Sequence, residues 1–124
     1  MAKSAVRVLI AIVVAGIVGT IANTAALVAV LGSDRLGLGL VPGRYLVAIL
    51  LCVALPLLDR WLRGASFWAV SIVWLTVAPS LLAKLVFGAA ADWTAVLGFN
   101  LVYALAALAT YWLIAGLRRG AVRD

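Results

Sequence analysis

The feature that most constrains the fold is an uncharged and almost wholly apolar stretch at residues 8–31. As an α-helix of about 24 residues, rising about 1.5 Å per residue, it would extend about 36 Å. The hydrocarbon core of a bilayer is about 30 Å thick, so this helix is long enough to cross it with a small tilt. Because the run exceeds the roughly 7–15 apolar residues of a signal-peptide core, we expect a retained first transmembrane helix.

Three more apolar runs follow, at residues 42–62, 66–87 and 93–117. Of the 124 residues, 68% are hydrophobic and only 11% are charged, whereas roughly a quarter are charged in soluble domains. Such a chain would expose apolar surface to water, but in a bilayer that surface faces lipid. The sequence therefore predicts an all-α integral membrane protein, with residues 1–124 forming a single domain that is an antiparallel four-helix transmembrane bundle.

Prolines mark the second and third runs. Pro42 suits the first turn of a helix, where its missing N–H costs nothing. Pro56 and Pro79 fall inside helices, where each removes a backbone hydrogen bond, so both are predicted to kink their helix. The hydroxyl groups of Thr76 and Ser80 are expected to help satisfy the backbone near Pro79.

Basic residues give the predicted orientation, which is N-in and C-in. Of the ten Lys and Arg residues, the seven that would face the cytoplasm are Lys3, Arg7, Arg60, Arg63, Arg118, Arg119 and Arg123. The three that would face outward are Arg35, Arg44 and Lys84, and this bias follows the positive-inside rule. Arg44 and Arg60 are expected to snorkel at opposite ends of the second helix. Because the net charge of +6 is spread between apolar runs, lipid contact is favoured over nucleic-acid binding.

Small residues recur at helical spacing in the first and last runs. They allow helices to approach closely in lipid, where burial of apolar surface drives little association. The stripe in the first run consists of Ala15, Gly19, Ala22 and Ala26, and the last run has Asn100, Ala104, Ala107 and Tyr111 at the same steps. We expect these two stripes to face each other.

Asparagine residues border or belong to both stripes. Asn23 lies about eight residues from the end of the first helix and Asn100 about seven from the start of the last, a depth of roughly 10–12 Å. Antiparallel packing at equal depth permits a direct hydrogen bond between them. Cys52 and Ser80 fall at comparable depth on the second and third helices. The sequence thus predicts a polar layer of Asn23, Cys52, Ser80 and Asn100 in the outer half of the bundle.

This layer has two open interpretations, a substrate or ion site and interhelical hydrogen bonding that only holds the bundle together. Proton-coupled transporters usually carry an acid or histidine inside the membrane. Here histidine is absent, and the four acidic residues lie at predicted helix ends or at the terminus: Asp34, Asp59, Asp92 and Asp124. Asp59 is expected to pair with Arg63. With no charge expected in the layer, the structural interpretation is favoured.

Function is predicted only as a class. One cysteine and no histidine leave no metal-ligand set or nucleophile–base pair, so no enzyme activity, metal or cofactor is expected. The favoured class is an accessory or assembly subunit that packs against a larger membrane partner. The alternative is a homo-oligomeric small transporter or channel. Expected partners are the lipid bilayer and another membrane protein or a second copy, and the Ala/Leu/Val/Arg-rich composition indicates a bacterial inner (plasma) membrane.

Overall fold

The computed structural model describes residues 2–32, 37, 41–86, 88 and 92–115, and the long elements in these ranges are helical. The five α-helices and one π-helix are α1 (Ala2–Leu31), α2 (Pro42–Cys52), α3 (Ala54–Trp61), α4 (Ala65–Leu81), η2 (Leu82–Val86) and α5 (Trp93–Ala115). They form four spans that are long and apolar enough to cross a membrane: Ala5–Leu31, Pro42–Trp61, Ala65–Val86 and Trp93–Ala115. The prediction of an all-α chain with four such spans is confirmed.

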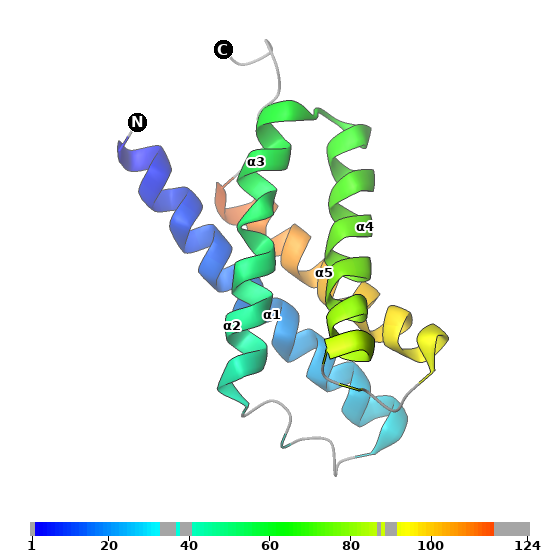
Figure 1. Cartoon of the computed structure of the whole chain (residues 1–124). Helices are drawn as coiled ribbons and strands as arrows, with labels where there is room; N and C mark the ends of the chain where they lie inside the picture. Colours follow the sequence, from blue (N-terminus) through cyan, green and yellow to red (C-terminus); the bar gives the residue numbers. More distant parts are fainter. Residues whose placement is uncertain (1, 33–36, 38–40, 87, 89–91, 116–124) are drawn as a thin grey trace.

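The spans alternate in direction along the chain (Figure 1). α2 and α3 stand beside α4, while α1 and α5 run obliquely behind them in this view. The most extensive contact joins α1 to α5, α4 packs on α5, and α2 packs on α1. The first and last helices therefore form the pair on which the others lie.

The second span is not one helix, because it is interrupted at Val53. Pro56 has no N–H to donate to the carbonyl of Cys52 and its ring crowds that carbonyl. Val53 keeps helical backbone angles, φ −59° and ψ −26°, but its N–H bonds to Leu50 O in a tighter turn at 3.2 Å. The result is two short helices in one nearly continuous rod (Figure 1).

The third span continues through Pro79 and changes winding afterwards. α4 ends at Leu81, and residues Leu82–Val86 form the π-helix η2. Ser80 Oγ donates to the carbonyl of Thr76 at 2.6 Å, but the buried Thr76 hydroxyl has no hydrogen-bond partner among the described residues. Only one of the two hydroxyls expected to support the backbone near Pro79 therefore does so.

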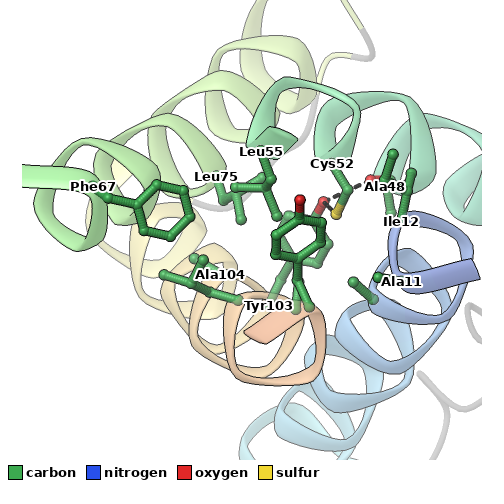
Figure 2. Close-up of a cluster of buried hydrophobic side chains, with 13 residues drawn as sticks. Ala11, Ile12, Ala48, Cys52, Leu55, Phe67, Leu75, Tyr103 and Ala104 are labelled. Carbon is green, nitrogen blue, oxygen red and sulfur yellow. Dashed lines mark hydrogen bonds between the residues drawn. The ribbon is translucent and has the colours of Figure 1, made fainter. Parts of the chain in front are cut away.

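The core lies between α5, α4, the second span and α1 (Figure 2). Its largest fully buried side chains are those of Leu55, Phe67, Leu75, Leu108 and Tyr111. On α5, the predicted stripe positions Ala104 and Ala107 are also fully buried.

Two glycines of α1 allow close approach of neighbouring helices. A Cβ added at Gly16 would lie 2.7 Å from Ile49 Cα and 2.8 Å from Ile49 N, both backbone atoms of α2. One added at Gly19 would lie 2.5 Å from the Tyr103 ring and 3.1 Å from Ala107 Cβ on α5. The predicted close approach of the first and last helices is therefore present, and α2 approaches α1 as closely at a second glycine.

Candidate functional site

A group of polar side chains joins all four spans, and we call it the Asn23 cluster: Asn23 and Thr24 of α1, Arg44 of α2, Ser80 of α4 and Asn100 of α5. In lipid, each polar group needs a partner because water is not at hand. The cluster supplies these partners from one helix to another.

Asn23 lies at the centre of the cluster. Its Nδ2 donates to the carbonyl of Phe99 at 2.8 Å and to Asn100 Oδ1 at 3.5 Å. Asn100 Nδ2 in turn donates to Ser80 Oγ at 2.9 Å. The structure therefore brings together three of the four residues of the predicted polar layer: Asn23, Ser80 and Asn100.

The sequence reasoning missed two members of the cluster, Thr24 and Arg44, of which Arg44 is charged. One guanidinium nitrogen, Nη2, donates to Asn23 Oδ1 at 2.6 Å, and the other, Nη1, donates to Thr24 Oγ1 at 2.8 Å. The residue is half-buried and reaches another helix, so the prediction that it snorkels toward the membrane surface is wrong. The signal was Pro42, which begins α2 early enough to place Arg44 within its first turn.

Thr24 shows how local structure prepares the acceptors for Arg44. Its hydroxyl donates to the carbonyl of Thr20 at 2.9 Å, and Thr20 donates to Gly16 O at 2.8 Å. Such back-bonding to the preceding turn satisfies a hydroxyl proton within the helix. The lone pairs of Thr24 Oγ1 then remain available to Arg44.

Cys52 belongs to a separate polar contact in the core (Figure 2). The Tyr103 hydroxyl donates to the carbonyl of Ala48 at 2.8 Å, and Cys52 Sγ lies 3.4 Å from the same hydroxyl. Trp74 makes a comparable contact nearby, since its Nε1 donates to Leu51 O at 3.0 Å. These bonds hold α5 and α4 against α2 just before the interruption at Val53.

Asp59 lies in the last turn of α3, at a helix end as expected, but its side chain is buried in the bundle. Its side chain is only 8% exposed, and its carboxylate interacts electrostatically with the Tyr111 hydroxyl of α5. It lies four residues after the fully buried Leu55 and thus on the same face of α3.

Two buried hydroxyls of α4, those of Ser71 and Thr76, have no hydrogen-bond partner among the described residues.

The Asn23 cluster can hold helices together by neutral and charge-assisted hydrogen bonds. Both amide hydrogens of Asn23 are used, and its oxygen accepts from Arg44. In comparisons of this chain with protein-family models, with curated proteins and with solved structures, nothing matched. The contacts described above are therefore the basis for a function.

Proposed function

We propose that this protein is a small, non-enzymatic accessory or assembly subunit of a larger membrane complex. The observation that carries the proposal is that polar side chains form hydrogen bonds with one another inside the bundle. In the Asn23 cluster, donors and acceptors of all four spans are committed to one another. A bundle built in this way offers apolar helix faces to its surroundings, and in a membrane these meet lipid or another protein.

The packed interior supports this proposal over passage of a solute through one copy. Fully buried side chains from all four spans meet there, among them Ala15, Leu55, Leu75 and Leu108. A path along the bundle axis would have to displace them. This is costly because protein interiors are packed as densely as organic crystals.

Uncovered helix faces provide the surface for a partner. In each span, no more than a third of the most apolar window is buried within the bundle. On α1, large side chains such as Leu9, Ile10 and Ile21 are at least half exposed. Lipid can cover such faces, and so can the helices of a larger membrane protein, which gain van der Waals contact by packing there.

A second function, a homo-oligomeric transporter or channel, is favoured by one observation. The polar layer was expected to be uncharged, but the Arg44 guanidinium lies in it. Charged side chains inside a membrane are rare and commonly mark pathways for ions or substrates. Because the core of one copy is filled, such a pathway would run between copies.

The experiment that tests the first function is purification of the tagged chain from its native membrane in a mild detergent, followed by native mass spectrometry. One other membrane protein in near-equal amount is the expected result. As a control, an unrelated tagged four-span protein from the same membrane should not retain it. A discrete homo-oligomer without any other protein would contradict the accessory function and favour the second.

The second function is tested by solute flux into liposomes that contain the purified protein. A transporter or channel requires flux that falls when Asn23 and Asn100 are both replaced by leucine, while the fraction of folded protein is measured alongside. If the double variant is less stable but its folded fraction retains full flux, the cluster does not line the pathway.

A further inference from the structure

We propose that the hydrogen-bond acceptors that α1 supplies to Arg44 promote the crossing of the membrane by the second span, so that the first two spans enter the bilayer as one unit. The inference rests on the membrane location in the proposed function. It assigns the Asn23 cluster a role in topology, which holds for an accessory subunit and for a transporter alike.

The second span has the smallest margin of length for insertion. It has 20 residues, the fewest of the four spans, and it is less apolar than the first span and only as apolar as the fourth. Its length of about 30 Å just matches the hydrocarbon core, so little can be lost from either end. Arg44 lies in its first turn, and arginine is among the residues that oppose insertion most strongly.

The structure shows how this opposition is removed. The two terminal nitrogens of Arg44 donate to two adjacent residues of α1, at 2.6 Å to Asn23 and 2.8 Å to Thr24. The Thr24 hydroxyl proton is already committed to Thr20 O, which leaves its oxygen to accept. A guanidinium has the fork geometry to bond both acceptors at once.

Close backbone packing fixes the two helices at this distance. Further along the same interface, the missing side chain of Gly16 allows the backbone of Ile49 to lie against α1. The acceptors also precede Arg44 by 20 and 21 residues in the sequence, so they are synthesised first. When Arg44 emerges, its partners can already be in place on α1.

If Arg44 instead snorkelled to the headgroups, its insertion would not depend on α1. The two cases differ in two respects. If insertion depends on α1, loss of the acceptors on α1 prevents insertion of the second span, and removal of the arginine restores it. General destabilisation of the bundle would not be repaired in this way.

Cysteine accessibility in the full chain tests the inference. One variant carries Gly37→Cys, between the first two spans and with open space around the added atom, and another carries Ala65→Cys, exposed at the start of α4. The native Cys52 is fully buried, and the parent chain measures its background. Intact cells are labelled with a membrane-impermeant maleimide, and the same labelling is repeated after lysis.

In the parent chain, positions 37 and 65 should label from opposite sides. Replacing both α1 acceptors, by Asn23→Leu with Thr24→Val, should lower the ratio of molecules whose second helix spans the membrane to those in which it does not, by about tenfold. An arginine at the centre of a helix lowers this ratio by about a hundredfold, and the effect of Arg44 is smaller because it lies near one end. Adding Arg44→Leu should restore the parent ratio. Asn100→Leu, which removes a bond of Asn23 but neither of the two α1 acceptors of Arg44, should leave the ratio unchanged.

A parent-like ratio after loss of both acceptors would overturn the inference, as would failure of Arg44→Leu to restore it. An equal loss in Asn100→Leu would also overturn it, because the acceptors of Arg44 would then have no special role. Failure of the membrane proposal itself has a different signature: positions 37 and 65 of the parent chain would label identically.

Discussion

Gly16→Ala is the substitution for which the structure gives the sharpest expectation. The added methyl carbon would lie 2.7 Å from Ile49 Cα and 2.8 Å from Ile49 N, whereas ordinary contacts are 3.4–4 Å. The added carbon would also meet the side-chain Cγ1 of Ile49, but the other two clashing atoms belong to the backbone of α2, so rotation of the Ile49 side chain alone cannot make room. The helices must separate locally by the difference between 3.4 and 2.7 Å, about 0.7 Å, and a gap of that size forfeits roughly a quarter to a half of the dispersion energy of the atoms that line it.

The expected change in the free energy of unfolding has two parts. Overpacking in a close interface costs about 1–3 kcal/mol, while exchanging glycine for alanine within a helix gains about 1 kcal/mol. Because backbone atoms are involved, we expect the upper part of the first range and a net loss of about 1–2 kcal/mol. Gly98→Ala is the matched control, since Gly98 is also helical but has open space around its added methyl group.

The two variants are compared by reversible unfolding in mixed detergent micelles, with far-ultraviolet circular dichroism as the signal. Both gain helix propensity, so the difference between them isolates the overpacking cost, about 1–3 kcal/mol. Equal stability of Gly16→Ala and Gly98→Ala would refute the close approach of α1 to α2. It would also remove one support for the inference about insertion, which depends on that interface.

Three further predictions can be checked by the same unfolding assay. Tyr103→Phe removes the bond to Ala48 O and the contact with Cys52 Sγ, and should cost about 0.6–2 kcal/mol; no loss would place that hydroxyl outside the interface. Gly19→Ala would press on the Tyr103 ring and should destabilise by up to about 2 kcal/mol after the gain in helix propensity; a stability equal to that of Gly98→Ala would contradict this close contact. Ser80→Ala deprives Asn100 Nδ2 of its acceptor and should cost about 1–3 kcal/mol, with Val77→Ala, at an exposed position of the same helix, as the neutral control.

Much of the architecture follows from the sequence because membrane physics leaves few choices. Long uncharged runs must become helices, since each backbone polar group needs an internal partner in lipid. The spacing of Gly19, Ala104 and Ala107 likewise points to the most extensive helix pair. Asn23 and Asn100 lie in reach of each other because two antiparallel helices that share a stripe must align residues of equal depth.

Contacts that depend on how a second helix docks could not be derived in this way. The sequence shows that Arg44 follows Pro42 closely, but not that its side chain turns toward α1 instead of the headgroups. Similarly, Pro56 indicates a disturbance without showing that the carbonyl of Leu51 would accept from Trp74. Both outcomes depend on which neighbour lies within a few ångströms, and no local pattern encodes that.

Arg44 is therefore the residue on which the two proposed functions make opposite predictions. Replacing a buried charge and its polar partners by apolar side chains is often neutral or stabilising by about 1–4 kcal/mol, whereas removing one partner leaves the rest uncompensated. If the Asn23 cluster only sets topology, the triple variant Asn23→Leu, Thr24→Val, Arg44→Leu should insert, fold and retain its membrane partner.

If the cluster lines a pathway, the same triple variant should fold equally well and lose solute flux. Arg44→Lys separates geometry from charge, because an ammonium group keeps the positive charge but lacks the planar fork that reaches Asn23 and Thr24 together. If the cluster sets topology, the charge of the lysine variant is imperfectly bonded. Its second helix should then cross the membrane less often than that of the triple variant, in which position 44 is leucine. A lysine variant that inserts as well as the parent and keeps full flux would show that charge, and not the two-pronged bond to α1, is what this position requires.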